Sequence, residues 1–505
     1  MSDDDVLVIG AGPTGLVLAL WLTKLGVRVR ILDKTAGPGT TSRALAVQAR
    51  TLELYRQLDL ADAVLARGHR VPAVNLWVKG ERAARLGFES IGASLTPYSF
   101  MEIFPQDEHE RLLIERLAAC GVQVERRSEL LGFREETDRV DARVRTAQGD
   151  EVQLSARYIA GCDGARSLVR ETIGAGFPGG TYRQVFYVAD IEGAGPPVDG
   201  ELHVDLDEAD FLAVFPLAGT GRARLVGAVR DERADRAETL DFADVSGRAI
   251  EHLGLEVRKV NWFSTYHVHH RVAGSFARGR AFVLGDAAHI HSPVGGQGMN
   301  TGIGDAINLA WKLAAVLGGR ADAALLDTYE AERISFARRL VATTDRAFSF
   351  VTADGPLADL VRTRVAPVVL STAVRLDVVR NFLFRTVSQL MLNYRGTALS
   401  EGVAGAVHGG DRLPWVGRGA LDNHEPLRSI GWQAHVYGDA VAELRAACSA
   451  RRLPLHIFPW SDAQAAAGLK RDALYLVRPD TYVALAAAAP APQVLERYFQ
   501  ARGLR

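Results

Sequence analysis

The pattern of apolar residues over the first 34 positions predicts a strand, a helix and a second strand. Residues 6–9 form a β-branched run, residues 13–25 carry apolar side chains at helical spacing, and residues 27–32 alternate. A glycine turn precedes the helix and Gly26 ends it. The chain therefore begins with a strand–helix–strand unit, which is typical of α/β domains.

Alternation of apolar and polar residues marks two blocks that interrupt this α/β pattern. One block covers residues 72–99, and the other contains alternating runs such as 182–191 and 211–217. A period of two predicts strands with one buried face. We expect residues 72–99 and 176–276 to form an antiparallel sheet inserted into the first domain.

The remaining pattern predicts one more buried strand at residues 280–285 and then several helices. The helical spacing covers residues 302–316, 329–350 and 356–395. A glycine-rich stretch, 402–410, precedes a last segment in which strands (432–437, 474–477, 482–485) alternate with helices. We therefore expect a first domain from residues 1–71, 100–175 and 277–400, the inserted sheet, and a small α/β domain from 410 to 505.

Length and charge narrow the classes of function. The 505 residues suffice for about three domains of ordinary size. Lysine and arginine (59) balance aspartate and glutamate (60), so the chain has no basic excess with which to bind nucleic acid. We expect no nucleic-acid partner.

Cysteine usage and hydropathy indicate the compartment. Cys120, Cys162 and Cys448 lie far apart without disulfide or zinc-ligand spacing, so we interpret them as buried thiols in a reducing compartment. The N-terminus is acidic, and no apolar run is long enough to span a membrane. A cytoplasmic protein without membrane contact is the expectation.

The turn between the first strand and helix fits the GxGxxG pattern at Gly10, Gly12 and Gly15. The first glycine makes the tight turn, the second lets a pyrophosphate approach, and the third lets helix and strand pack closely. Asp33 ends the second strand, where it is placed to accept hydrogen bonds from a ribose. This context favours dinucleotide binding over the alternative, an ordinary glycine-rich turn in an α/β sheet.

A second match to the spacing, at Gly174, Gly176 and Gly179, has the wrong context. It follows the helix-like residues 167–173 and leads into a strand. We interpret it as a loop and expect no second Rossmann motif for a nicotinamide cofactor.

Two aspartates follow predicted strands and are expected at the ligand crevice of the sheet. Asp163 lies in the segment Cys-Asp-Gly-Ala-Arg-Ser after the strand 156–161, and Asp286 lies in Gly-Asp-Ala-Ala-His after the strand 281–284. Downstream, the glycine-rich residues 291–302 open a helix. Backbone N–H groups at such a helix start suit developing negative charge.

With these three ordered motifs, residues 5 to about 345 resemble the single-component (class A) flavoprotein aromatic hydroxylases of the para-hydroxybenzoate and phenol hydroxylase type, most closely the branch acting on polyketides and antibiotics. The resemblance implies a Rossmann-like FAD domain and an inserted substrate-binding sheet domain. Residues 476–484 resemble part of the thioredoxin-like C-terminal domain of the longer members. That domain holds only Cys448, so we expect a packing or oligomerisation role.

The resemblance also implies site residues for one extended FAD. Gly10, Gly12, Gly15 and Asp33 would hold the ADP half, Arg43 and Gln106 would contact the pyrophosphate and ribitol, and Asp286 would bond the ribitol or pyrophosphate. Pro293 would lie beside the reactive edge of the ring, and with Arg43 it is the expected catalytic pair. Backbone N–H groups of Gly298, Met299 and Asn300 would face N1 and O2, and Asp163 and Arg166 would serve flavin packing and transient nicotinamide binding.

The implied reaction is hydroxylation of a phenolic or polycyclic aromatic compound. NAD(P)H reduces FAD, O2 adds at C4a to give a hydroperoxide, and its distal oxygen attacks the ring; the protein supplies placement and exclusion of water. Phe211, Phe215 and Trp262 are the candidate pocket residues, with ordinary sheet core as the alternative. The oligomeric state is left open, with a homodimer as the candidate assembly.

Other functions remain open at this point. A Baeyer–Villiger or antibiotic-inactivating monooxygenase would share the fold, whereas a halogenase is disfavoured because no WxWxIP segment occurs. A non-flavin NAD-binding dehydrogenase or a ligand-binding protein would be of a different class. The histidines at 267, 269, 270, 289 and 291 lack carboxylate or cysteine partners at ligand spacing, so we expect no metal.

Overall fold

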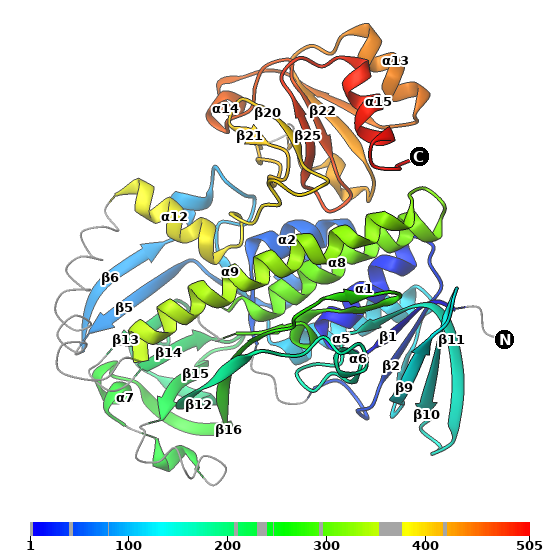
Figure 1. Cartoon of the computed structure of the whole chain (residues 1–505). Helices are drawn as coiled ribbons and strands as arrows, with labels where there is room; N and C mark the ends of the chain where they lie inside the picture. Colours follow the sequence, from blue (N-terminus) through cyan, green and yellow to red (C-terminus); the bar gives the residue numbers. More distant parts are fainter. Residues whose placement is uncertain are drawn as a thin grey trace.

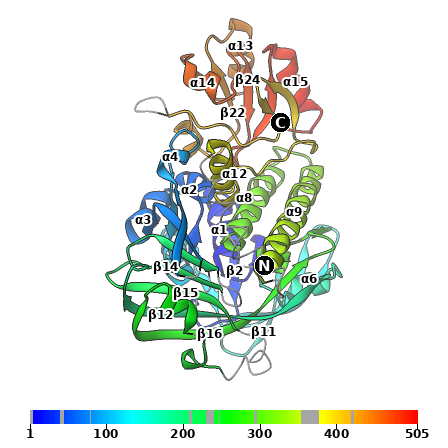
Figure 2. The same ribbon diagram turned by 90° about the vertical axis from the view of Figure 1, so that its left-hand side faces the viewer.

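The computed structural model describes residues 4–39, 44–78, 80–206, 211–229, 240–245, 247–291, 296–352, 376–417 and 422–505. Figure 1 shows a sheet domain and a helix-covered α/β domain side by side, and the C-terminal domain lies above them in both Figure 1 and Figure 2. Within these ranges, no helix is both long and apolar enough to cross a membrane.

The first domain is built on an eight-stranded sheet with a parallel centre. Strand β1 lies between β2 and β11 and runs parallel to both, and β11 also runs parallel to β18. The strands are β1 (Asp4–Ile9), β2 (Val29–Asp33), β8 (Val124–Arg126), β9 (Glu129–Glu135), β10 (Val140–Arg145), β11 (Glu151–Gly161), β17 (Ala277–Arg278) and β18 (Ala281–Val283).

Three helices cover this sheet, and α1 (Pro13–Lys24) is buried along most of its length. Pro13 occupies its first turn, where the fixed φ of proline favours a helix start, and its residues 15–22 are all buried. Helices α5 (Gln106–Ala119) and α8 (Gly298–Leu317) pack against α1. The opening strand–helix–strand prediction is therefore confirmed.

The second sheet has the strand order β19-β16-β12-β15-β14-β13-β5-β6. It is antiparallel except for β5, which pairs in parallel with β13, and it recruits β19 from downstream of β18. The strands are β5 (Ala73–Val78), β6 (Glu81–Gly87), β12 (Gly179–Ala194), β13 (Leu202–Leu206), β14 (Phe211–Pro216), β15 (Arg222–Val229), β16 (Glu256–Val272) and β19 (His289–Ile290). Helix α7 (Arg248–His252) packs on one face through Ala249 and Leu253.

Short elements join the two sheets. Strands β3 (Ala46–Val47), β7 (Met101–Ile103) and β4 (His69–Val71) form a small sheet of their own. The helices of this region are α2 (Ala49–Tyr55), α3 (Ala61–Arg67), α4 (Glu89–Gly92) and α6 (Leu168–Thr172). Helix α6 precedes Gly174 and Gly176, both at φ +64°, and β12 begins at Gly179, so the interpretation of this glycine segment as a loop is confirmed.

Two helices and a mixed sheet complete the fold. Helices α9 (Asp327–Thr352) and α12 (Asp377–Val387) lie beside α8 and near α4, respectively. The C-terminal sheet contains β20 (Glu401–Ala404), β21 (Val407–His408), β22 (Gln433–Tyr437), β23 (Leu455–Phe458), β24 (Leu474–Val477) and β25 (Val483–Ala487), with helices α13 (Ala442–Ala450), α14 (Asp462–Ala466) and α15 (Pro492–Gln500).

Some expected boundaries differ from the observed elements. The glycine-rich stretch that we expected to precede the C-terminal domain supplies two of its strands, because β20 pairs with β25. Helix α8 begins four residues before the expected start at 302, since the buried side chain of Asn300 anchors its first turn. The part of the expected helix 356–395 that spans 356–375 lies outside the described residues. The described part ends at Val387 rather than 395, where the chain turns and Gln389 takes φ +58°.

Candidate active site

The glycine turn between β1 and α1 leaves one of its three glycines open. Gly10 has φ +100°, and a Cβ there would lie 2.2 Å from the carbonyl oxygen of Cys162. A Cβ on Gly15 would lie 2.0 Å from the carbonyl oxygen of Gly10. A Cβ on Gly12 would meet no described atom within 4 Å. Gly10 and Gly15 thus allow close packing of the strand, the turn and the helix. Gly12 faces open space into which the pyrophosphate of a dinucleotide fits.

Asp33, at the end of β2, holds this turn in place. Its Oδ2 accepts the backbone N–H of Ala11 at 2.7 Å, and its Oδ1 accepts the N–H and hydroxyl of Thr35 at 2.7 and 2.6 Å. Among the described residues, Asp33 forms an ion pair with Arg126, whose Nη1 lies 3.6 Å from Asp33 Oδ1. The carboxylate predicted to bind a ribose therefore also fixes the shape of the glycine turn.

Gln106 begins α5 and lies on the same side of the domain as the loop before residue 40. Its Nε2 donates to Glu110 Oε1 at 2.8 Å, and Glu110 Oε2 accepts the backbone N–H of Gly39 at 2.9 Å. Glu110 thus links Gln106 to the loop that leads toward Arg43.

Asp163 caps helix α6. Its Oδ2 accepts the backbone N–H groups of Leu168 at 2.8 Å and Val169 at 3.3 Å, which a short helix would otherwise leave unpaired. Burial raises the pKa of this carboxyl above its ordinary value, although these hydrogen bonds oppose the shift. Arg166, the other residue named for this motif, is exposed to solvent.

Arg170, which the motifs did not single out, joins the two aspartate segments. It is buried, and it donates to the carbonyl oxygens of Ala287 at 3.0 Å and Ala165 at 2.9 Å. Its guanidinium carbon lies 3.8 Å from the ring centre of Phe177. The signal that could have identified Arg170 in the sequence is a charged residue at a position of a short helix that faces the core, three residues beyond Ser167.

Thr14, Gly285 and Gly302 bring together the first helix, the segment of Asp286 and the first turn of α8. A Cβ on Gly285, at φ +57°, would lie 2.6 Å from Thr14 Oγ1, and a Cβ on Gly302 would lie 2.3 Å from the same oxygen. Asp286 follows this contact with an exposed side chain. No hydrogen bond or ion pair within the described part of the chain engages that carboxylate, so it is accessible to a ligand.

Asn300 fixes the first turn of α8 with all of its hydrogen-bonding capacity. Its Oδ1 accepts from the backbone N–H of Gln48 at 2.9 Å and from Thr51 Oγ1 at 2.8 Å, and its Nδ2 donates to the carbonyl oxygens of Ala46 and Gly296 at 2.8 and 2.9 Å. Within the described part of the chain, no side chain caps this helix. The N–H groups of its first turn, at residues 298–300, are therefore oriented outward with the positive end of the helix dipole.

Behind this turn lies a buried polar centre around Asp305. Its Oδ1 accepts from Arg333 Nε at 2.6 Å, and its Oδ2 accepts from His289 Nε2 at 2.7 Å and from the backbone N–H of Gly285 at 3.0 Å. Arg333 also donates to Tyr394 Oη at 2.9 Å and to the carbonyl oxygen of Thr301 at 3.0 Å. Burial would raise the pKa of Asp305, but Arg333 and the hydrogen bonds hold it below its ordinary value.

The predicted pocket residues lie together on the sheet domain. Phe211, Phe215 and Trp262 are half-buried members of one apolar cluster on the face opposite α7. Register places Phe215 beside Arg224, Arg224 beside Asp190, and Asp190 beside Trp262 on four adjacent strands. Arg224 binds Asp190 with two hydrogen bonds of 2.6 and 2.8 Å, so an internally paired charge lies between two aromatic rings.

Both predicted catalytic residues, Arg43 and Pro293, lie outside the described residues, because they fall in the ranges 40–43 and 292–295. Among the described residues, no three histidine, cysteine or carboxylate side chains are grouped to hold a metal. Cys448 is buried and Cys162 is half-buried, but Cys120 is exposed. The interpretation of all three cysteines as buried is thus wrong for Cys120, which follows the last turn of α5 on its solvent side.

Comparison with known proteins decides the family. The sequence pattern described as "FAD binding domain" matches residues 3–344. The chain belongs to this family. Over 402 residues it is 38% identical to 6-methylpretetramide 4-monooxygenase of Streptomyces rimosus, which covers 78% of this chain and 69% of that protein. It is 32% identical to a flavin-dependent monooxygenase of Mycobacteroides abscessus over 95% of this chain and 96% of that one.

A solved structure supports the same assignment over the whole chain. The ternary complex of aklavinone-11 hydroxylase with FAD and aklavinone superposes with a TM-score of 0.79 at 26% identity, covering 100% of both chains. The protein is therefore an FAD-dependent monooxygenase of the aromatic hydroxylase type, as the three motifs predicted. The residues present fit the cofactor, because the open space at Gly12, the exposed Asp286 and the uncapped start of α8 offer the donors and the room that a flavin dinucleotide needs.

Proposed function

We propose that this flavoprotein hydroxylates an uncharged, flat polycyclic phenol with NAD(P)H as the reductant. The half-buried aromatic side chains of Phe211, Phe215 and Trp262 on the sheet domain, here called the aromatic row, carry this proposal. Phe215 and Trp262 present ring surface to a planar substrate, and the Arg224 charge between them is already neutralised by Asp190. A carboxylated arene would need an arginine whose charge is not so paired, since burying two charged groups without compensation is costly.

In this proposal each motif holds one part of the cofactor. The glycine turn and Asp33 bind the ADP half, Gln106 and Asp286 contact the ribitol and pyrophosphate, and the N–H groups at residues 298–300 lie along the pyrimidine edge of the ring. Bound FAD supplies the activation of O2. The chain positions the ring against the aromatic row and keeps water away from it.

The test is substrate-dependent NAD(P)H oxidation by the FAD-loaded protein. We expect neutral polycyclic phenols to stimulate oxidation and to gain one oxygen atom from labelled O2, whereas carboxylated monocyclic arenes should not. A ring-expanded or ring-opened product would instead indicate Baeyer–Villiger chemistry. Protein that stays colourless after FAD is added would overturn the flavin assignment itself, and Asp286→Ala should weaken FAD retention without lowering the unfolding temperature of the apoprotein.

A further inference from the structure

The C-terminal domain reaches α8 through fully buried charges rather than through a surface contact. Arg478, in the turn after β24, donates to both carboxylate oxygens of Glu332 on α9, at 2.6 and 2.9 Å. Glu332 also accepts from Lys312 Nζ at 2.8 Å and from Asn308 Nδ2 at 2.7 Å, both on α8. The side chains of Arg478, Glu332 and Lys312 have no exposed surface. Although burial alone would raise the pKa of Glu332, the two cations hold it well below its ordinary value.

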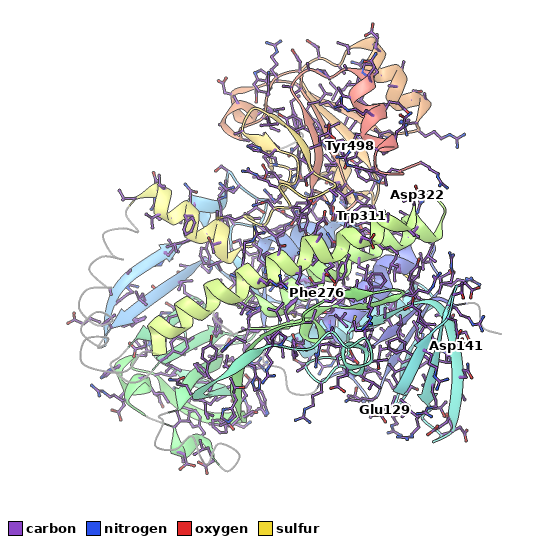
Figure 3. All side chains as sticks on the ribbon, viewed as in Figure 1. Glu129, Asp141, Phe276, Trp311, Asp322 and Tyr498 are labelled. Carbon is purple, nitrogen blue, oxygen red and sulfur yellow. The ribbon has the colours of Figure 1, made fainter. Side chains whose placement is uncertain are left out.

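Asp480 adds a second connection to the same helix. It binds Arg478 at 2.9 and 2.6 Å, and its Oδ2 accepts the indole N–H of Trp311 at 3.1 Å. Trp311 lies on α8 at the border with the C-terminal domain, as labelled in Figure 3. The centres of the Trp311 and Trp432 rings are 5.7 Å apart. Two cations and two anions are thus sealed between α8, α9 and the C-terminal domain.

The turn that contains Arg478 and Asp480 also hydrogen-bonds to α2, and α2 hydrogen-bonds to the start of α8. The carbonyl oxygen of Asp480 accepts from Arg50 Nη2 at 2.9 Å, and Arg50 pairs with Glu53 at 3.1 Å. Arg412 of the C-terminal segment donates to Glu53 through Nε at 2.7 Å. One residue after Arg50, Thr51 donates to Asn300, the residue that fixes the first turn of α8.

We propose that Arg478 and Asp480 are positioning residues for the flavin, and that the C-terminal domain is in this way part of the cofactor site. The inference rests on the proposed placement of the ring at the first turn of α8. The buried charges hydrogen-bond to α8 at Asn308 and Lys312, and α2 hydrogen-bonds to it at Asn300. The direction of the uncapped N–H groups at the start of α8 therefore depends on the C-terminal domain. This route reaches the flavin without any residue of that domain touching it.

The decisive variant is Arg478→Met in the holoenzyme, because it removes the guanidinium but keeps much of the apolar volume. We expect the FAD dissociation constant to rise at least tenfold, the reduction potential of bound FAD to fall, and amide hydrogen exchange at residues 299–302 to quicken. The matched control is Arg497→Met, an exposed arginine of the same domain that pairs with Glu401 at 3.0 Å. The control should change none of these three properties.

Two outcomes would overturn the inference while leaving the flavin assignment intact. One is Arg478→Met protein with a lowered unfolding temperature but unchanged FAD affinity, potential and exchange. If that variant does not fold, Asp480→Asn keeps the shape of the turn and is expected to show the same changes in milder form. In the unaltered holoenzyme, amides of the 474–485 hairpin and of the first turn of α8 should open together as denaturant rises; independent opening would refute the coupling.

Discussion

Asp305 Oδ2 lies 2.7 Å from Nε2 of His289, and both side chains are buried. The same oxygen accepts the backbone N–H of Gly285, so one carboxylate holds both ends of the segment that presents Asp286. Its other oxygen is occupied by Arg333 at 2.6 Å. Asp305 is therefore the internal anchor of the Gly-Asp motif, although no motif includes it.

We predict that Asp305→Asn destabilises the protein by about 3–5 kcal/mol, because Arg333 would keep a buried charge without its counter-ion. Urea unfolding of the holoenzyme at neutral pH measures the effect. Asp59→Asn is the control, since Asp59 is 62% exposed and its pairs with Lys24 and Arg428 lie at the surface; it should cost no more than about 1 kcal/mol. Equal stabilities for the two variants would contradict a buried anchor.

The glycine turn provides a second prediction, in which two similar substitutions act on different properties. Gly15→Ala should lower stability, because its Cβ would lie 2.0 Å from the carbonyl oxygen of Gly10. Gly12 has φ −77°, which alanine adopts without strain, and its Cβ would meet no described atom within 4 Å. Gly12→Ala should therefore keep the stability of the apoprotein but weaken FAD binding at least tenfold, as measured by titration of apoprotein with FAD. Tight FAD binding by Gly12→Ala would place the pyrophosphate elsewhere.

The contrast between these two sites explains which features the sequence could predict. The contacts of Gly10 and Gly15 lie within one strand–turn–helix unit and the segment that follows the adjacent strand. Only glycine satisfies these two contacts, so the turn can be predicted from local spacing. Asp305 and Arg333 sit on two helices, 28 residues apart, in positions that read as ordinary amphipathic spacing. Their partnership depends on how α8 packs against α9, which no local pattern encodes.

In the C-terminal domain, too, the sequence predicted some strands but not others. Three of its strands beyond residue 432, β22, β24 and β25, were predicted closely, because each is a short apolar run between turns, whereas β23 was not predicted. The two strands in the glycine-rich stretch were not predicted, because glycine ordinarily weakens a strand. Here the missing Cβ of Gly402 and of Gly409 lets neighbouring backbone lie 2.3 Å from where that Cβ would be, which the local sequence does not show. Likewise, nothing in the order of residues shows that Arg478 would meet Glu332 across 146 positions.

Glu102 on β7 gives a prediction about pH. It has no exposed surface, and neither carboxyl oxygen has a hydrogen-bond partner among the described residues. Burial raises the pKa of Glu102 to about 8, with only Arg70 opposing the shift. Between the ordinary pKa of 4.5 and about 8 the folded protein keeps a proton that the unfolded chain has lost, so this group makes the free energy of unfolding fall as pH rises, by at most about 1.4 kcal/mol per pH unit.

Glu102→Gln should remove that contribution to the slope. Urea unfolding of both proteins at several values between pH 5 and 8 gives the comparison, and the variant should gain stability relative to the unaltered protein as pH rises. The exposed Glu136→Gln serves as control and should run parallel to the unaltered protein at every pH. Parallel curves for Glu102→Gln would show that its carboxyl ionises normally in the folded state.

Two neighbouring aromatic residues of β16 offer the last prediction, because they point to opposite faces of the sheet. Trp262 lies in the half-buried row with Phe215, whereas Phe263 stacks on Tyr187 at 6.0 Å and contacts Phe242 on the side of α7. Trp262→Leu should raise the KM for the aromatic substrate five- to fiftyfold while the FAD dissociation constant stays unchanged, since only ring surface toward the substrate is lost. Phe263→Leu should lower stability by about 1–2 kcal/mol and leave KM unchanged, because it loosens core packing alone. Steady-state NAD(P)H oxidation and urea unfolding measure the two effects, and a KM that rises only in Phe263→Leu would place the substrate on the opposite face of the sheet.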